Sequence, residues 1–394
     1  MDLRYTDADE AFRAELRSWL ESTLQDLPAP PARDDWAERR RYDTDWQRRL
    51  HDAGYAGLNW PERVGGRAAS PSEQLIFLEE TTRARAPYVG VNFVGTLHAG
   101  PTLIAEASEE QQERYLPSIL RGDEVWCQGF SEPTAGSDLA SLRTKAVRDG
   151  DEYVVNGQKI WCSFAQVADF CELLVRTDPE AKKQAGITWL ILPMDSPGIE
   201  IRPIDTVAGS SEFAEVFLGD VRVPVANRVG DENDGWRITQ VTFSFERGTA
   251  FVSELVDARR LANELAVLAR RAPRMEGSAW DDATVRRELG HIVAELDALW
   301  ALTKRNVSQA ERTGSPGPGS MMIKLAYSEA RQRLGELSLR VLDRAALAFS
   351  DDLLSGADEL LEERLRTLAL TIAAGTSQIQ RNIIAERVLG LPRK

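Results

Sequence analysis

Hydrophobic residues recur at helical spacing through the first part of the chain, up to about residue 120. In the first segment, four of them share one predicted helix face: Phe12, Leu16, Trp19 and Leu20. Thr6 precedes this face and is a predicted N-cap. Further helices are predicted over three ranges, separated by Gly and Pro breaks such as LNWPERVGGR: 44–54, 72–84 and 109–120.

The pattern changes near Gly122 and stays changed until about Pro224. Short runs of β-branched and alternating residues, such as ITWLILPM, IEIRPI and AEVFLGDVRV, are typical of strands. Two turn signals within RTKAVRDGDEYVVNGQKIW, Asp149-Gly150 and Asn156-Gly157, predict hairpins. We therefore expect an antiparallel β-domain in this part of the chain.

After DENDGWR the helical spacing returns and continues to the end. Four helices are predicted there: over 234–270, 282–312, 321–347 and 357–390. TGSPGPGS, residues 313–320, is most simply a loop between two of them. The sequence thus predicts an α+β chain of three domains: an N-terminal helical domain (1–121), a middle β-domain (122–226) and a C-terminal helical bundle (227–394).

Composition and charge narrow the function classes. The chain has 394 residues, of which 43% are hydrophobic, so it is long enough for a sizeable core. The net charge of −14 and the lack of a basic run argue against nucleic acid or an anionic membrane surface as the main partner. No apolar run approaches the roughly 18–20 residues of a membrane span. The charged N-terminus, MDLRYTDADEAFRAELRSWL, does not resemble a secretory signal.

The cysteines fit neither a disulfide framework nor a zinc site, because their number is odd and their spacing irregular: Cys127, Cys162 and Cys171. With three histidines in the chain, we expect no His-based metal site. These features favour the reducing cytoplasm as the compartment.

Two stretches of the β-domain carry candidate ligand-binding groups. FSEPTAGSDLASLRT (130–144) supplies hydroxyls and open backbone on a loop, which can hydrogen-bond a polar ligand. In KIWCSF (159–164), a Trp followed two residues later by a Ser could stack an aromatic ligand and hydrogen-bond its edge. An ordinary polar turn and a core Trp beside a surface Ser are the structural alternatives.

A third stretch, AAGTSQIQRNIIAERVLGLPR (373–393), lies near the C-terminus. The helix that starts near residue 357 is predicted to break at Gly375, and Thr376 is a predicted cap for a new helix. The break leaves N–H groups free for a phosphate or another polar oxygen. The structural alternative is a plain corner between two helices.

Together these stretches resemble the acyl-CoA dehydrogenase family. SEPTAGSD, NGQKIWCS, VRVPVANRVGDENDGW and GTSQIQRNIIAERVLG occur in the family's order and spacing, and LNWPERVGG is similar to its helical-domain marker. The resemblance covers nearly the whole chain. It implies the family fold, which has an N-terminal helical domain, a middle β-domain and a C-terminal four-helix bundle.

The resemblance also implies an FAD flavoprotein that oxidises an acyl-CoA thioester to a trans-2-enoyl-CoA and passes electrons to an electron-transfer flavoprotein. Carried over by position, Ser131 hydrogen-bonds the flavin ring, Ser163 lies near its N5 edge, and Trp161 packs along the ring. Ser131 and Ser163 stand where many members have Thr, and both keep a hydroxyl. The remaining implied positions are Ser137 at the boundary of ligand and cofactor, and Thr376 with Gln378 as cofactor contacts.

The reaction requires a carboxylate that removes the α-proton. Many members place this Glu directly before the Gly-Thr of the C-terminal motif, where this chain has Ala374. A minority place it on a bundle helix directly before an Arg, and Glu246-Arg247 within TFSFERGTAF matches that position. Glu246 is therefore the expected base, with Arg247 organising the pocket wall. Ala374 keeps its backbone N–H, which can polarise the substrate carbonyl together with a flavin ribityl hydroxyl. A structural role for Glu246-Arg247 is the alternative.

Two motifs that grip the adenine half of a neighbouring subunit's FAD in family tetramers are absent. The corresponding regions read RRAPRMEGSAW (270–280) and LDRAALAF (342–349). We therefore expect a heterotetramer in which a second family subunit completes the cofactor site, with a homo-oligomer as the alternative.

Other functions stay open at this level: a non-catalytic partner subunit, an acyl-CoA oxidase, or a flavin oxygenase on the same fold. The acyl group is not defined by the sequence. A branched, polyketide-like or sterol side-chain thioester, on CoA or on a carrier protein, is compatible with a base on the bundle helix.

Overall fold

The computed structural model describes residues 4–32, 34–87, 89–246, 251–313, 319–348 and 354–392, with backbone alone for Phe245, Glu246 and Ser320. The chain forms two compact units. We name Met1–Leu24, Ser70–Ala86 and Thr249–Lys394 the bundle unit, and Gln25–Ala69 with Pro87–Gly248 the sheet unit. No helix in the described ranges is long and apolar enough to cross a membrane. The division into three domains at residues 122 and 227 stays a prediction.

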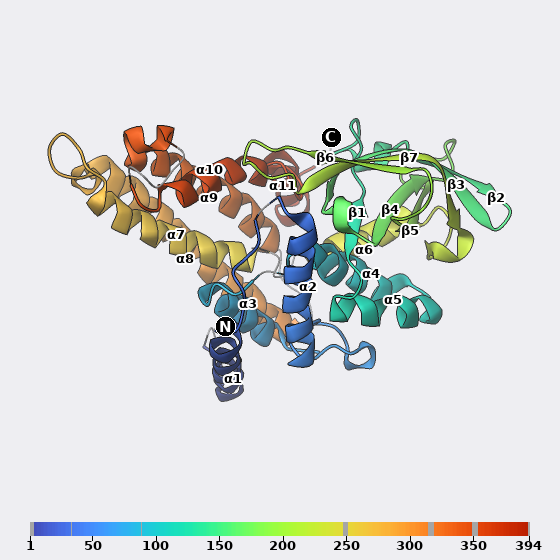
Figure 1. The fold of residues 1–394 in the computed structure, drawn as a ribbon, viewed down its shortest axis with the longest axis horizontal. Coiled ribbons are helices and arrows are strands. Elements are labelled where there is room, and N and C mark those ends of the chain that lie inside the picture. The colour runs from blue at the N-terminus through green and yellow to red at the C-terminus, as the bar shows by residue number, and fades with distance from the viewer. Residues whose placement is uncertain are drawn as a thin grey trace. The chain divides into compact units, whose positions relative to one another are not determined.

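The bundle unit is helical, and its helices are labelled in Figure 1: α1 (Asp7–Leu24), α3 (Pro71–Arg83), α7 (Val252–Arg271), α8 (Ala283–Thr313), α9 (Gly319–Leu342), α10 (Ala357–Leu370) and α11 (Ser377–Ile383). Helix α8 packs against α7 and α9, and α9 packs against α10. Their apolar faces meet in one core that includes Leu255, Leu296 and Leu334. Burial of this core is the main force that holds the bundle together.

Helix α1 is fixed to α3 by buried charge. Arg13 donates to Glu79 at 2.9 Å and to Glu80 at 2.5 Å, and all three side chains are nearly inaccessible to solvent. The predicted N-cap of α1 is confirmed, because the N–H of Asp9 donates to Thr6 Oγ1 at 3.1 Å.

Several predicted helices of the C-terminal part differ in extent. The predicted helix over 234–270 is two helices, because Phe251 is the N-cap of α7 and lies outside the helical conformation. Apolar residues keep the same spacing on both sides, so periodicity alone does not mark this boundary. Helix α9 ends at Leu342 and continues as a 3-10 helix over Asp343–Leu347. Of the predicted loop at 313–320, residues 314–318 lie outside the described residues.

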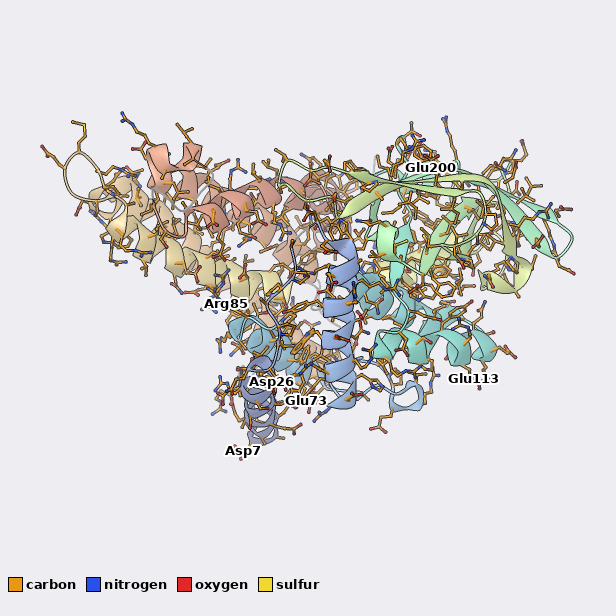
Figure 2. All side chains as sticks on the ribbon, in the orientation of Figure 1. Asp7, Asp26, Glu73, Arg85, Glu113 and Glu200 are labelled. Carbon is orange, nitrogen blue, oxygen red and sulfur yellow. The ribbon has the colours of Figure 1, made fainter. Side chains whose placement is uncertain are left out.

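The sheet unit combines helices with one sheet. Its α-helices are α2 (Trp36–Asp52), α4 (Gly100–Glu106), α5 (Glu109–Arg121) and α6 (Gly235–Glu246). Its strands are β1 (Trp126–Gly129), β2 (Lys145–Asp149), β3 (Glu152–Ser163), β4 (Phe170–Arg176), β5 (Ile187–Pro193), β6 (Ile199–Ile204), β7 (Phe213–Pro224) and β8 (Arg228–Val229). Figure 2 shows charged side chains pointing outward from this unit, such as Glu113 on α5 and Glu200 on β6.

Helix α2 begins eight residues before the predicted start at 44. Asp35 caps it by accepting the N–H of Glu38 at 3.1 Å. The periodicity was hidden because the buried face of α2 is itself partly polar: Asp43, Thr44, Trp46, Gln47 and Leu50. Tertiary hydrogen bonds satisfy this face, for example from Gln47 Nε2 to the carbonyl of Leu120 at 3.1 Å.

The strands form a sheet in the order β6-β7-β3-β2-β4-β5-β8, with β1 paired to β4. Most neighbours are antiparallel, as predicted, whereas β1 runs parallel to β4, and β2 meets β4 in a short parallel pairing. The core of the sheet includes Cys127, Cys162 and Cys171, all free and buried. Burial raises the pKa of the Cys162 thiol, so this thiol is held in its unreactive form.

One predicted hairpin is confirmed and the other is wrong. Asp149-Gly150 turns β2 into β3, and Gly150 adopts φ +64°. Asn156-Gly157 lies inside β3, where the register against β7 shifts in a bulge. The side chain of Asn156 bonds Asp220 across the strands, which satisfies it without a turn. At Gly157 a Cβ would lie 2.4 Å from Thr144 Oγ1, so close packing requires glycine here.

Helix α6 begins directly against strand β5. Gly235 is its first residue, and a Cβ there would lie 2.6 Å from the carbonyl carbon of Thr188 and 2.7 Å from the nitrogen of Trp189. One turn before the helix end, the hydroxyls of Thr242 and Thr102 on α4 are 2.8 Å apart in the interior. Backbone contact at one end and a buried hydrogen bond near the other therefore fix the course of α6.

We expect Gly235→Ala to destabilise the chain by about 1–3 kcal/mol, because the added methyl group must push α6 away from β5. The matched control is Gly290→Ala on α8, where a Cβ meets no atom within 4 Å. That control should gain about 0.5–1 kcal/mol, since Gly inside a helix costs more conformational entropy than Ala. Thermal unfolding followed by circular dichroism measures both. Equal melting temperatures for the two variants would contradict the close approach.

Candidate functional site

Glu132 closes the loop that carries Ser131 and Ser137. Its carboxylate is buried and accepts the backbone N–H groups of Arg143 at 2.7 Å and Thr144 at 2.8 Å. The two ends of the 130–144 stretch are thereby held together. Ser131 is half-buried and Ser137 is exposed in the same loop.

A fully buried lysine ties this loop to strand β3. Lys159 Nζ donates to Glu132 at 2.9 Å and to the carbonyl of Phe130 at 3.1 Å. Burial lowers the pKa of Lys159, and the Glu132 carboxylate acts in the opposite direction. Burial also acts to raise the pKa of Glu132, but the Lys159 ammonium and Thr144 outweigh it and hold that pKa below its usual range. Each charge is thus the main compensation for the other.

Trp161 projects from a bulge in β3. The register against β7 shifts between Lys159 and Cys162, and Trp161 adopts φ +61° with 54% of its surface exposed. A left-handed backbone costs an L-residue about 1–2 kcal/mol. The ring meets Phe213 edge-on at 5.9 Å, which leaves much of the indole open to a ligand. Strained bulges of this kind are common beside functional sites.

Ser163 is the last residue of β3 and is half-buried. The residue after it, Phe164, is held in place by its backbone and its ring. Phe164 adopts φ +57°, and its N–H donates to the carbonyl of Glu212 at 2.7 Å. The Phe164 ring packs against Trp36 at 5.6 Å and Phe93 at 6.1 Å. This aromatic cluster fixes the strand end that presents the Ser163 hydroxyl.

The structure brings Ser131 to the bulge that carries Trp161. The N–H of Ile160 donates to the carbonyl of Ser131 at 3.0 Å, so the loop and the strand are joined at the residue next to Trp161. Ser163 follows on the same strand. In the described part of the chain, no hydrogen bond links the side chain of Ser137 to these residues.

Helix α6 also contacts the Ser131 loop. Phe243 meets Phe130, the neighbour of Ser131, edge-on at 6.2 Å. Glu246 is the last residue of α6, and its side chain lies outside the described residues. Arg247 lies outside them entirely. The expected base therefore follows, by less than one helical turn, a residue that contacts the Ser131 loop.

In the bundle unit, the turn between α10 and α11 carries the remaining predicted positions. Its break at Gly375 and its N-cap are confirmed, because the N–H of Ile379 donates to Thr376 Oγ1 at 3.1 Å. Ala374 and Gly375 adopt φ +50° and +83°. Among the described residues, the backbone N–H of Ala374 has no acceptor.

Thr376 and Gln378 line an open hollow of about 550 Å³ on the bundle unit. Gln332, Arg333 and Arg381 also line it, and they offer amide and guanidinium donors. Between the two predicted contacts, Ser377 Oγ is buried and has no hydrogen-bond partner among the residues described. Two carboxylates, Glu329 and Glu336, line the hollow as well, and Glu329 pairs with Arg381 at 2.5 Å. The unpartnered hydroxyl and this mixed polar lining suit the hydroxyl groups of a dinucleotide cofactor.

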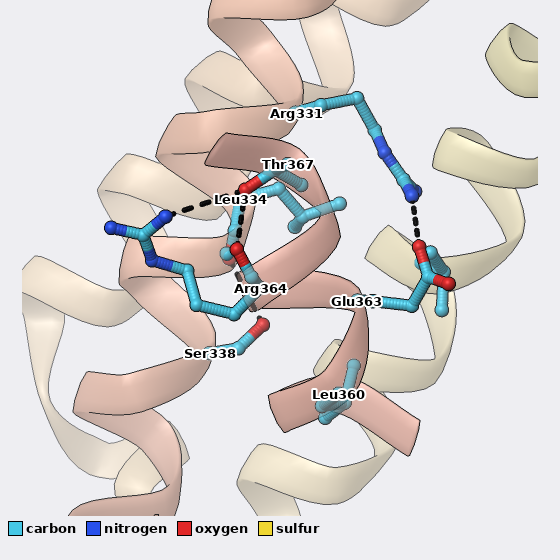
Figure 3. Close-up of a pocket in the computed structure, with 9 residues that line it drawn as sticks. Arg331, Leu334, Ser338, Leu360, Glu363, Arg364 and Thr367 are labelled. Atoms are coloured by element: carbon cyan, nitrogen blue, oxygen red, sulfur yellow. Dashed lines mark hydrogen bonds and ion pairs between the residues drawn. The ribbon is translucent and has the colours of Figure 1, made fainter. Parts of the chain in front are cut away.

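A second hollow lies inside the bundle and is too small for a cofactor (Figure 3). Figure 3 shows Arg331 paired with Glu363, and Arg364 donating to Thr367 Oγ1 at 3.4 Å. The volume of about 10 Å³ holds one water at most. No group of side chains that could hold a metal ion occurs in the part of the chain that the structure describes.

Two groups of charged residues in the structure were not among the predicted site residues. Glu132 and Lys159 stand inside the quoted motifs, and the alternation of β3 placed Lys159 on its inner face, so this pair could have been found. Glu254 on α7 gave no signal. Burial raises the pKa of Glu254 to about 7, and Arg331 opposes the rise. Its Oε2 has no hydrogen-bond partner among the described residues.

The chain is similar to known proteins of one family along its sequence. Models of the acyl-CoA dehydrogenase N-terminal, middle and C-terminal domains match residues 6–123, 127–221 and 233–389. The acyl-CoA dehydrogenase IpdE1 of Mycobacterium tuberculosis is 41% identical, over 98% of this chain and 98% of its own length. IpdE1 of Mycolicibacterium smegmatis is 39% identical, again over 98% of both chains.

Two solved structures are similar over the full chain. A steroid ACAD, Tcur3481-Tcur3483, aligns with a TM-score of 0.83 and 33% identity, covering 100% of both chains. The ChsE4-ChsE5 complex from Mycobacterium tuberculosis aligns with a TM-score of 0.82 and 34% identity, also over 100% of both chains.

The raised pKa of Glu254 predicts a pH dependence of stability. The folded chain keeps a proton that the unfolded chain releases, so this group lowers stability as pH rises from about 4.5 to about 7. Glu254→Gln removes that loss and should exceed the parent by up to about 3 kcal/mol at pH 8, with little difference near pH 5. Exposed Glu276→Gln is the control. Urea unfolding at several pH values tests this, and a gap that does not vary with pH would refute the raised pKa.

Proposed function

We propose that this chain, which belongs to the acyl-CoA dehydrogenase family, oxidises the Cα–Cβ bond of an acyl-CoA thioester to a trans-2-enoyl-CoA. The observation that carries the proposal is the Ser131 loop joined to the strained Trp161 bulge, with Ser163 on the same strand. An exposed indole between two hydroxyls suits a flat aromatic ring with polar edges.

The residues present fit FAD as the cofactor. In the sheet unit, Ser131 and Ser163 would hydrogen-bond the flavin ring, Trp161 would pack along it, and Ser137 would lie at the boundary with the substrate. In the bundle unit, Thr376 and Gln378 would contact the cofactor, as the polar hollow that they line and the unpartnered Ser377 hydroxyl support. When bound, FAD supplies the acceptor for the hydride that leaves Cβ.

Glu246 is the proposed base for the α-proton. Its helix is held against β5 at Gly235 and against the Ser131 loop at Phe243, so the helix end has a fixed place in the sheet unit. In the sequence Glu246 lies between Phe residues, and a carboxylate in a dry pocket is suited to removing an α-proton. Ala374 offers no carboxylate, whereas its free N–H can donate to the substrate carbonyl.

The substrate is proposed to be a bulky, steroid-derived acyl-CoA. The support is the steroid ACAD that aligns over the whole chain at 33% identity. A base on α6 in place of one at position 374, expected for branched or bulky acyl groups, points the same way. Electron-transfer flavoprotein is the proposed electron acceptor. Stoichiometric hydrogen peroxide during turnover would instead favour an oxidase.

Glu246→Gln should lower kcat by about 10²–10⁴-fold, because the amide cannot take the α-proton. The matched control is Glu254→Gln, which changes a buried carboxyl group on the next helix and should keep parent activity. The assay follows flavin bleaching by a panel of acyl-CoA thioesters, with the flavin content of every variant measured first. Parent-level bleaching by Glu246→Gln would remove Glu246 as the base and favour a non-catalytic partner subunit.

A second family subunit is the proposed partner. The support is the absence of both adenine-gripping motifs at 270–280 and 342–349, together with two similar solved structures, the Tcur3481-Tcur3483 steroid ACAD and the ChsE4-ChsE5 complex. The chain purified alone should therefore bind clearly less than one FAD per chain, and coexpression with the second subunit should restore tight binding. Absorbance at the flavin band against protein concentration measures this. One FAD per chain in a homo-oligomer would end the need for a partner.

A further inference from the structure

We propose that Lys324 is a positioning residue, whose ammonium group holds the 371–376 turn in the shape that presents the backbone N–H of Ala374 to the acyl carbonyl. The inference rests on the proposed function and adds to it a residue that does not touch the substrate. It draws on contacts within the bundle unit.

Lys324 bridges the two ends of the turn. Its Nζ donates to the carbonyl of Leu370, the last residue of α10, at 2.9 Å. It also donates to the carbonyl of Gly375, just before the N-cap of α11, at 2.8 Å. One ammonium group therefore bridges the segment between the two helices, and the N–H of Ser377 also closes it by donating to the carbonyl of Thr371 at 3.0 Å. Carbonyls at a helix C-terminus carry partial negative charge, which favours a cation there.

The burial of Lys324 shows how closely the turn depends on it. The residue is 4% exposed, and in the described chain no carboxylate forms an ion pair with it. Burial lowers the pKa of Lys324 to about 8, and Glu329, itself paired with Arg381 at 2.5 Å, opposes this. At neutral pH the side chain is mainly protonated, so both hydrogen bonds are charge-assisted. An ammonium whose hydrogen bonds go to two carbonyls favours the one backbone geometry that supplies both.

The turn contains the strained backbone that such a bridge is needed to hold. Ala374 and Gly375 adopt φ +50° and +83°, and for Ala this region is unfavourable. Gln380 Nε2 donates to the carbonyl of Ala374 at 3.2 Å, which fixes the peptide from the other side. The N–H of Ala374 is left without an acceptor among the described residues. A strained residue with a free N–H is the arrangement expected of an oxyanion donor.

Helix α9 offers a polar stripe to this turn. Lys324, Ser328 and Gln332 follow at intervals of four residues and so share one helix face. Gln332 Nε2 donates to the carbonyl of Thr367 at 3.1 Å and to Thr371 Oγ1 at 3.0 Å. Lys324 contacts both ends of the turn and Gln332 its start, so of these two side chains Lys324 is the one that bonds Gly375, the residue after Ala374.

The first test is hydrogen–deuterium exchange of the full chain, with its cofactor and any partner subunit it is purified with. In Lys324→Met, amides of residues 371–377 should exchange at least about 10-fold faster than in the parent. Lys324→Arg should lie nearer the parent because it keeps the charge and the donors. Leu334→Ala on the same helix is the matched control, since it removes core packing without touching the turn. Unchanged exchange over 371–377 in Lys324→Met would overturn the proposal.

The second test separates positioning from general stability. With a thioester that bleaches the parent flavin, Lys324→Met should lose about 10-fold or more in kcat, with KM changed less than about 3-fold. Lys324→Arg should recover part of the loss, and Leu334→Ala should keep parent kcat despite a lower melting temperature. A kcat for Lys324→Met equal to that of Leu334→Ala would reduce Lys324 to a structural residue. Should Lys324→Met fail to fold, Lys324→Gln, too short to reach both carbonyls, takes its place.

The two tests keep this inference distinct from the proposed function. If no acyl-CoA thioester bleaches the parent flavin, the proposed function fails, and with it the presentation of Ala374 to a substrate. The exchange experiment still decides whether Lys324 holds the turn. If the parent oxidises a thioester and exchange over 371–377 is unchanged in Lys324→Met, the proposed function stands and the positioning role fails.

Discussion

The buried ion pair between Lys159 and Glu132 is the interaction on which the arrangement of the sheet unit depends. Both side chains are almost fully removed from water, so each charge would be costly without the other. Glu132 also accepts two backbone N–H groups, and Lys159 donates to one backbone carbonyl. The pair therefore joins the Ser131 loop to strand β3 at one fixed register. Once that register is set, the next residues on the strand bulge outward, and Trp161 is presented in a conformation that a regular strand would not give it.

The bundle unit uses a buried lysine in a comparable way, with a different compensation. Lys159 is balanced by a carboxylate, whereas Lys324 is balanced by two backbone carbonyls. Burial lowers the pKa of both lysines, which shows that each pays a desolvation cost. In both units the buried lysine holds a short irregular segment: the bulge at Trp161 and the turn at Ala374. These two buried lysines therefore fix the shape of short backbone segments, whereas buried Arg13 joins two regular helices.

Local signals in the sequence predicted the features whose causes are local. Thr376 caps α11 and Gly150 makes the β2–β3 turn because capping and left-handed turns depend on one or two residues. The bulge at Gly157 was misread as a turn, since the position is constrained by the close approach of Thr144, thirteen residues earlier in the sequence. The left-handed backbone of Trp161 was not predictable either. It follows from pairing with β7, which lies some fifty residues further along the chain.

Ala374 has a strained backbone that its own side chain does not stabilise. A left-handed Ala costs about 1–2 kcal/mol, and its methyl group is exposed, so it makes no buried contact that offsets this cost. The conformation persists because two side chains hold the backbone around it. Gln380 donates to the carbonyl of Ala374, and Lys324 donates to the carbonyl of Gly375. These contacts hold the turn in which the Ala374 N–H lies, and any residue except proline would provide that N–H. A turn held in this way keeps a backbone donor without a carboxylate at position 374. In the proposed function, proton removal therefore depends on a residue elsewhere in the chain, Glu246.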